Sequence, residues 1–180
     1  TPSPHSKVGE VGAMNSVHFA ACHPGNGGPD APYLPSDLVT VNGHPITRYT
    51  YKNTVSYFLR MKAGQFGEWK IYPGRSVETA DASTTYSDYT DFVNTLYYIY
   101  KNEVDSSVTD KQVSFHYPDI DEKINPNDHH DHLVAGRAGC EAAKIMGRLL
   151  DTCFSQSLYV DYFSQNLPEN LTPADSRNEA

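Results

Sequence analysis

The densest group of chemically reactive side chains in the sequence lies at residues 128–132. Three histidines and two aspartates occupy these five positions: Asp128, His129, His130, Asp131 and His132. Zinc prefers imidazole nitrogen and carboxylate oxygen, and a catalytic zinc site keeps one position open for water. Carboxylates behind a ligand histidine fix its tautomer and orientation. The segment is therefore a candidate metal site, although its composition alone fits a solvated, histidine-rich turn before a helix equally well.

The elements around this segment predict an α/β fold. Residues 113–117 have the composition of a strand, and residues 132–150 repeat small and apolar side chains at helical spacing. Within that helix, Gly136 and Gly139 are expected to permit close packing. Residues 158–163 predict a last strand. The histidine segment would thus follow a strand directly, at the edge of an α/β sheet where ligands bind.

Turn and cap signals organise the preceding part of the chain. Asn42-Gly43 separates two β-rich runs and predicts a hairpin, because both central residues of a type I′ turn need a positive φ. Pro45 is expected to delay the start of the second strand. Ser87 or Asp88 can cap a helix that runs to about Tyr100.

Composition excludes several classes of function. The formal net charge of -8 argues against a nucleic-acid partner, which needs a basic surface. No apolar run approaches the roughly 20 residues of a membrane span. The odd count of three cysteines rules out a fully paired disulfide framework, and Cys140 in its Ala-rich helical pattern is expected to be a buried thiol. An acidic, tyrosine-rich chain is typical of secreted sugar-handling proteins, so we expect an extracellular or cell-envelope location.

Residues 128–136 resemble the second motif of the LmbE/PIG-L family of zinc-dependent N-acetylglucosaminyl deacetylases, His-Pro-Asp-His-x-x-x-Gly. The preceding residues 124–127 also resemble bacterial members. Further segments that look like larger LmbE-like proteins are residues 51–60, 83–86, 159–162 and 166–171. The resemblance spans most of residues 10–172, and the histidine motif is its chemically specific part.

The resemblance implies roles for the motif residues. His132 would bind zinc, His129 would assist catalysis near the scissile amide, and Asp131 would support His129. His130 stands where the family has proline, and we expect it to be exposed. Asp128 is a further candidate ligand. The implied reaction is hydrolysis of an N-acetyl group from an amino sugar or its conjugate, with an aspartate activating the water.

The family's opening motif, His-Pro-Asp-Asp, does not occur in this sequence. Residues 19–26 contain His23 and a following proline, but glycine and asparagine replace both aspartates. In one interpretation residues 10–21 resemble a later Arg-Glu-x-Gly-Ala helix of the family, so the opening strand lies outside the chain. In the other, residues 17–24 are a decayed motif, and His23 and Asp30 are substitute ligands. We favour the first interpretation.

Other residues are weaker candidates. Asp119 follows the strand and could line the site, whereas His116 is better explained as a packed or hydrogen-bonded strand residue. Arg60 could hold an anion, but a structural ion pair is the preferred interpretation. Three aromatic residues of an irregular stretch could form a sugar-stacking platform or that stretch's own core: Trp69, Tyr72 and Tyr86.

The sequence therefore predicts an α/β, Rossmann-like three-layer sheet of the LmbE/PIG-L type that lacks its first strands. We expect residues 1–180 to form a single, N-terminally incomplete domain, with loose termini at residues 1–9 and 173–180. The expected cofactor is Zn²⁺ and the expected partner is an amino-sugar substrate or glycan, and a homo-oligomer is left open. The alternative is a non-catalytic LmbE-like remnant that serves as an extracellular carbohydrate-binding or structural module.

Overall fold

The computed structural model describes residues 36–51, 54–107, 113–150 and 154–160, together with Ser164 and Asn166. The chain divides into two compact units. The first consists of Thr1–Val39, Ile46–Leu59 and Asn166–Ala180, and the second of Thr40–Pro45 and Arg60–Gln165. The histidine segment and both α-helices lie in the second unit.

Strands β1 (Ser36–Val41), β2 (His44–Tyr51) and β3 (Thr54–Phe58) form one sheet in the order β1-β2-β3. Asn42 and Gly43 join β1 to β2 with φ values of 52° and 83°, which confirms the predicted hairpin turn. The expectation that the second strand starts after Pro45 is wrong, because β2 begins at His44. The pairing of β2 with β3 reaches only to Thr47, so the missing N–H of Pro45 interrupts no hydrogen bond on that side.

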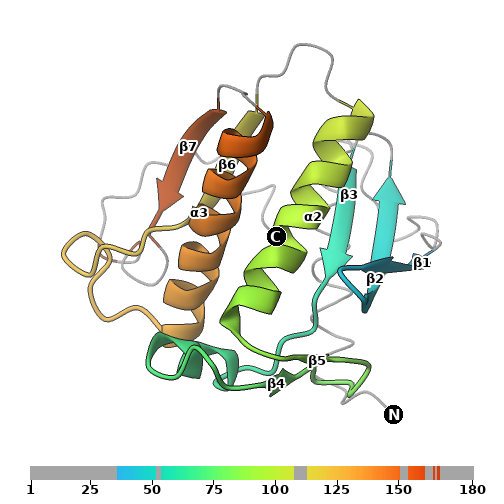
Figure 1. Cartoon of the computed structure of the whole chain (residues 1–180). Helices are drawn as coiled ribbons and strands as arrows, with labels where there is room; N and C mark the ends of the chain where they lie inside the picture. Colours follow the sequence, from blue (N-terminus) through green and yellow to red (C-terminus); the bar gives the residue numbers. More distant parts are fainter. Residues whose placement is uncertain are drawn as a thin grey trace, which may run out of the picture. The chain divides into compact units, whose positions relative to one another are not determined.

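Helix α2 (Tyr89–Ser107) begins at a cap that the sequence predicted. The Asp88 carboxylate accepts a hydrogen bond of 2.8 Å from the Asp91 N–H, which satisfies a backbone donor in the first turn. Phe92 and Ile99 are buried on one face of the helix. In Figure 1, α2 lies beside α3 (His130–Leu150), against which it packs.

A β-α-β crossover carries the histidine segment. Strand β6 (Val113–Pro118) pairs in parallel with β7 (Phe154–Tyr159), and α3 connects them and packs on β6 (Figure 1). The predicted last strand at residues 158–163 is misplaced, since β7 ends at Tyr159 and residues 161–163 lie outside the described part. The polar run Ser-Gln-Ser at 155–157 obscured this strand, four of whose six residues are exposed.

Glycines set the close packing of α3 on β6. A Cβ atom on Gly136 would overlap the Pro118 carbonyl oxygen, and one on Gly139 would lie 3.4 Å from the Tyr117 Cβ. The predicted close packing is therefore confirmed at Gly136, whereas the distance at Gly139 is an ordinary van der Waals contact. A buried cluster lies between β6 and α3, and the half-buried Cys140 thiol packs against it. Its members are Phe115, Tyr117, Ala143 and Met146.

The segment between β3 and α2 builds its own aromatic core. The 3-10 helix η1 (Phe66–Lys70) packs against α3, and its Trp69 is buried 5.4 Å from the ring of Phe92. Strands β4 (Val77–Glu78) and β5 (Thr85–Tyr86) pair antiparallel, and the Tyr86 ring packs edge-on against Phe92. Of the three candidate platform residues, Trp69 and Tyr86 are therefore core residues, and only Tyr72 is exposed.

The described part of the chain is a mixed α/β structure with small sheets and two α-helices. None of its helices combines the length and the apolar character that a membrane crossing requires.

Candidate metal and substrate site

The loop between β6 and α3 is held by its own aspartates and an asparagine. Asp119 is buried at the end of β6, and its carboxylate accepts a hydrogen bond from the Asp121 N–H. The Asn125 side chain is fully buried and donates to the Asp119 carbonyl oxygen at 3.2 Å and to Asp128 Oδ2 at 2.7 Å. These bonds fix the approach of the chain to α3, so the histidines start from a defined position.

The Asp128 carboxylate orients His132. The Asp128 side chain is 0% exposed, and its Oδ1 lies 2.8 Å from His132 Nδ1. Because a carboxylate only accepts hydrogen bonds, Nδ1 of His132 carries the proton, and in the neutral ring Nε2 carries the lone pair. Asp128 Oδ1 also accepts the His129 N–H at 2.8 Å. With its oxygens engaged in this way, Asp128 orients the His132 ring.

His129 is held in the opposite tautomer. Its Nδ1 accepts a hydrogen bond of 3.2 Å from the Asp131 N–H. Because a backbone N–H only donates, Nδ1 of His129 carries the lone pair, and the proton of the neutral ring is on Nε2. The His129 side chain is 50% exposed, whereas that of His132 is 29% exposed, and their ring centroids are 5.8 Å apart.

The Asp131 carboxylate joins α3 to the segment before η1. Its Oδ2 accepts the Gly64 N–H at 2.6 Å, and its Oδ1 accepts the Gly67 N–H at 2.8 Å. Asp131 Oδ2 is 3.6 Å from His129 Nδ1, which is longer than a hydrogen bond. Asp131 therefore contacts His129 through its backbone N–H, while its side chain holds the neighbouring segment.

A groove lies beside His129. It has a volume of about 370 Å³ and is lined from within residues 64–72 on one side and by residues 127–130 on the other. Ile71 and Tyr72 are 63% and 60% exposed on the first side. His130 is exposed on the second side, as the sequence predicted. We call this feature the histidine groove.

The weaker candidates have structural partners. His116 is exposed on β6, where its Nδ1 lies 2.7 Å from the Tyr159 hydroxyl, as the hydrogen-bonded interpretation predicted. Arg60 pairs with Asp81 at 2.6 Å, which confirms the structural ion pair. His23 and Asp30 lie outside the described residues, so nothing places them relative to His132.

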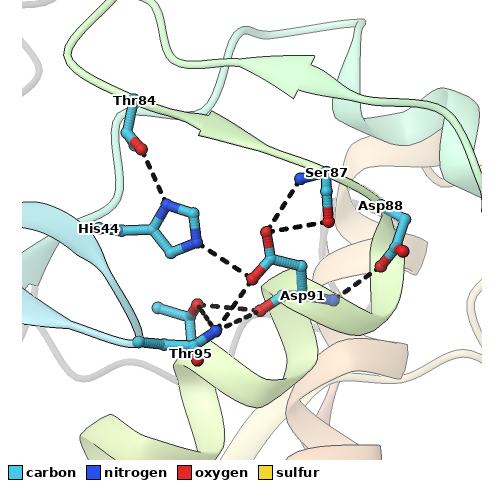
Figure 2. Close-up of polar contacts among 7 residues, drawn as sticks. His44, Thr84, Ser87, Asp88, Asp91 and Thr95 are labelled. Carbon is cyan, nitrogen blue, oxygen red and sulfur yellow. Dashed lines mark hydrogen bonds and ion pairs between the residues drawn. The ribbon is translucent and has the colours of Figure 1, made fainter.

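A second polar cluster escaped the sequence analysis (Figure 2). The buried His44 ring lies between Thr84 Oγ1, 2.8 Å from Nδ1, and Asp91 Oδ1, 3.1 Å from Nε2. The Asn42 side chain also donates to Asp91 Oδ1 at 2.9 Å, and Ser87 donates its N–H to Asp91 Oδ2. The sequence offered Ser87 or Asp88 as the cap of α2, but no local signal indicated His44, whose partners lie at least 40 residues away.

Electrostatics in this second cluster favour the charged carboxylate. Burial alone would raise the pKa of Asp91, but the Ser87 N–H and the His44 ring outweigh that effect and lower the pKa. Burial, followed by the negative charge of Asp91, raises the pKa of Tyr86, which stacks on His44 with ring centroids 4.3 Å apart. The cluster is thus a hydrogen-bonded network around the contact between His44 and Asp91.

Within the described residues, no group of three or more histidine, cysteine, aspartate or glutamate side chains is arranged to hold a metal ion. Comparison of the chain with family models, with curated proteins and with solved structures finds no match.

Proposed function

We propose that the chain carries the second histidine motif of a zinc-dependent N-deacetylase of the LmbE/PIG-L type, which hydrolyses an N-acetyl group on an amino sugar or its conjugate. One observation carries the proposal: His132, in the first turn of α3, and His129, just before that helix, are held in opposite tautomers. A metal ligand needs a lone pair on its outer nitrogen, whereas an oxyanion donor needs a proton there.

Each histidine then has a separate role. His132 presents the Nε2 lone pair to zinc while Asp128 fixes the ring from behind. His129 presents an Nε2–H, which donates to the developing oxyanion or to the leaving amine. When bound, zinc supplies Lewis-acid polarisation of the amide.

The donor set fits zinc only in part. His132 supplies one nitrogen, and the Asp128 oxygens are already engaged by hydrogen bonds. A catalytic zinc site has three protein ligands, so the other two and the general base would come from outside the described residues. His23 and Asp30 are the first candidates in this chain.

The position of the site in the fold also supports the proposal. The loop leaves the carboxyl end of β6 within a β-α-β crossover, which is where α/β sheets bind ligands. This arrangement suits a Rossmann-like sheet of the LmbE/PIG-L type, and an extracellular or cell-envelope location stays part of the proposal.

Zinc content of the purified 180-residue chain tests the metal assignment, with His132→Ala as the variant and His130→Ala as the matched control. We expect the wild type and His130→Ala to retain equal zinc and His132→Ala to lose it. Near-stoichiometric zinc would place the missing ligands within residues 1–180, and a much lower level would fit the favoured interpretation, in which they lie outside the chain. Equal zinc in both variants, or none in the wild type, would contradict a zinc site completed within this chain.

Release of acetate from N-acetylglucosamine and di-N-acetylchitobiose tests the reaction. We expect release to require zinc and to fall steeply in His129→Ala, which removes the oxyanion donor without touching the metal nitrogen. Sugar binding that ignores both zinc and chelator, with no acetate released, would instead favour the non-catalytic carbohydrate-binding module.

A further inference from the structure

A separate pocket lies between η1, the loop that follows β6 and the first two turns of α3. It has a volume of about 310 Å³ and shares no lining residue with the histidine groove. This volume is at the lower end of the range of about 300–1,000 Å³ that is typical of small-molecule sites. We call it the aromatic pocket. The buried part of its lining consists of Trp69, Tyr89, Leu133 and Val134.

Two cations, Lys70 and Arg137, also line the aromatic pocket. Lys70 Nζ contacts Glu122 Oε1, and Arg137 Nε donates to Glu141 Oε1 at 3.0 Å. All four side chains of these pairs are at least 36% exposed. Because exposed ion pairs contribute little to stability, either cation can turn toward a ligand at small cost.

Arg137 is placed to receive a carboxylate. Its guanidinium lies over the Tyr89 ring, with Cζ 5.5 Å from the ring centroid, and this contact holds it beside the pocket. The hydrogen bond to Glu141 uses Nε, so Nη1 and Nη2 can bind an acceptor from outside the chain. Burial, followed by the negative charge of Glu141, raises the pKa of Tyr89, so the phenol stays uncharged at neutral pH and does not repel an anion.

The charge of this lining differs from that of the chain and of the histidine groove. The chain has a formal net charge of -8, yet the lining of the aromatic pocket has two cations and a single carboxylate, that of Glu122. Among the described residues that line the histidine groove, Glu68 and Asp128 are acidic, and none is Lys or Arg. The lining of the aromatic pocket is therefore the one that attracts an anion.

We infer that the aromatic pocket binds a small monocarboxylate with an aromatic body. The carboxylate would pair with Arg137 and Lys70, and the aromatic ring would pack on the buried lining that includes Trp69. Ile120 lines the pocket and is 43% exposed, so a ligand would also cover part of its side chain. The inference goes beyond the proposed function, because no lining residue belongs to the segment 128–132.

The single tryptophan of the chain gives a direct measurement. Trp69 lines the aromatic pocket, so tryptophan fluorescence reports on its occupancy. Hydrocinnamate is titrated into the full chain in the presence of EDTA, which removes any metal that could hold a carboxylate, and binding is checked by calorimetry. We expect a saturable fluorescence change with a Kd below about 1 mM. Hydrocinnamamide, which has the same body without the charge, should bind about tenfold more weakly, and phenylpropylamine more weakly still.

Two pairs of variants place the ligand in the pocket. Arg137→Gln should weaken hydrocinnamate binding about tenfold, with Arg148→Gln as the matched control, since Arg148 is an exposed arginine of α3 outside the pocket. The Arg137 side chain is 56% exposed, so its replacement should not disturb folding. Ile120→Ala should weaken binding about two- to fivefold, whereas Ile124→Ala, which changes an exposed isoleucine of the same loop outside the pocket, should not.

Several results would overturn the inference. They are equal binding of hydrocinnamate and its amide, tighter binding of the amine, equal effects of Arg137→Gln and Arg148→Gln, and no fluorescence change or heat up to about 10 mM ligand. Binding that is lost in His132→Ala would place the ligand at the histidine segment and also overturn the pocket assignment. Because the titration contains EDTA and releases no acetate, this inference and the proposed deacetylation can fail separately.

Discussion

The His44–Asp91 and His132–Asp128 pairs of the second unit differ in what surrounds them. At His44, both ring nitrogens are engaged, the ring stacks on Tyr86, and the side chain is 9% exposed. At His132, one nitrogen is fixed by a fully buried Asp128, and the pair lies next to the histidine groove. The His44 ring is thus enclosed by partners, whereas His132 is a more exposed ring with a buried carboxylate behind it.

Removing the enclosed histidine should have the largest effect on stability. His44→Ala deletes hydrogen bonds to Thr84 and Asp91 and leaves a void against Tyr86. We expect the free energy of unfolding to fall by about 2–4 kcal/mol, measured by urea denaturation followed by circular dichroism. His130→Ala is the control and should change the free energy by less than about 0.5 kcal/mol. Similar losses of unfolding free energy in His44→Ala and His130→Ala would show that the enclosed histidine stabilises the fold no more than an exposed one.

Gly67→Ala should disturb the junction of the groove wall with α3. The added Cβ atom would overlap Asp131 Oδ1, so we expect a loss of about 1–3 kcal/mol in unfolding free energy and weaker sugar binding. Gly74→Ala is the matched control, because a Cβ atom there meets nothing within 4 Å. A Gly67→Ala protein as stable as Gly74→Ala would show that the wall does not depend on this contact.

Asp128→Asn should weaken zinc binding at the His132–Asp128 pair. The change keeps the shape of the side chain but removes the charge behind His132, so we expect zinc affinity to fall about 10–100-fold in calorimetry. Asp121→Asn, an exposed residue of the same loop, should leave zinc affinity unchanged. Asp91→Asn should also leave it unchanged in the folded protein, because Asp91 serves the other cluster.

Acid should destabilise the folded protein by protonating carboxylates whose pKa is lowered in the structure. Burial alone would raise the pKa of Asp81, but hydrogen bonds from Ser83, Thr79 and Arg60 outweigh it and lower the pKa to about 2 from an ordinary 3.8. A lowered folded-state pKa stabilises the protein above pH 3.8, and this stability is lost as the pH falls toward 2. The loss should be about 2 kcal/mol.

Unfolding free energies measured between about pH 5 and pH 2 check this expectation. Asp81→Asn should flatten the acid limb, whereas Asp37→Asn should not, because Asp37 lies in an exposed pair with Arg48. The pKa of Asp91 is also lowered, so its protonation in acid should further reduce the free energy of unfolding. An acid limb that is unchanged in Asp81→Asn would contradict the assigned pKa.

Features that depend only on neighbouring residues, such as turns, helix caps and close helix packing, could be predicted from the sequence. Asn42-Gly43 requires positive φ, Asp88 caps α2, and Gly136 permits close packing, so each could be inferred from its own neighbourhood. Strand β7 was misplaced because residues 155–157 are polar and four of its six residues are exposed, so it lacks an apolar alternation. The His44 cluster could not be predicted, because its partners meet only after the hairpin and α2 have formed.

The candidate site also has local features that the sequence predicted and long-range contacts that it did not. The histidine segment was visible because its residues are adjacent. The sequence made Asp128 a further candidate ligand, and only the structure shows that its carboxylate orients the His132 ring. The attachment of the Asp131 side chain to Gly64 and Gly67 was not visible, since it joins residues 64 and 67 positions apart. The exposed Tyr72 could be separated from the buried Trp69 and Tyr86 only in three dimensions.

The double attachment of Asp131 also has a consequence for the order of folding. Closing a loop of more than 60 residues costs entropy that is recovered only after α3 and η1 have formed, so this joint should be among the last contacts made and the first released. Because one carboxylate holds both amides, the Gly64 and Gly67 protons should exchange with solvent together, in a single opening event. Hydrogen exchange followed residue by residue would then report the opening of the groove before the rest of the unit unfolds.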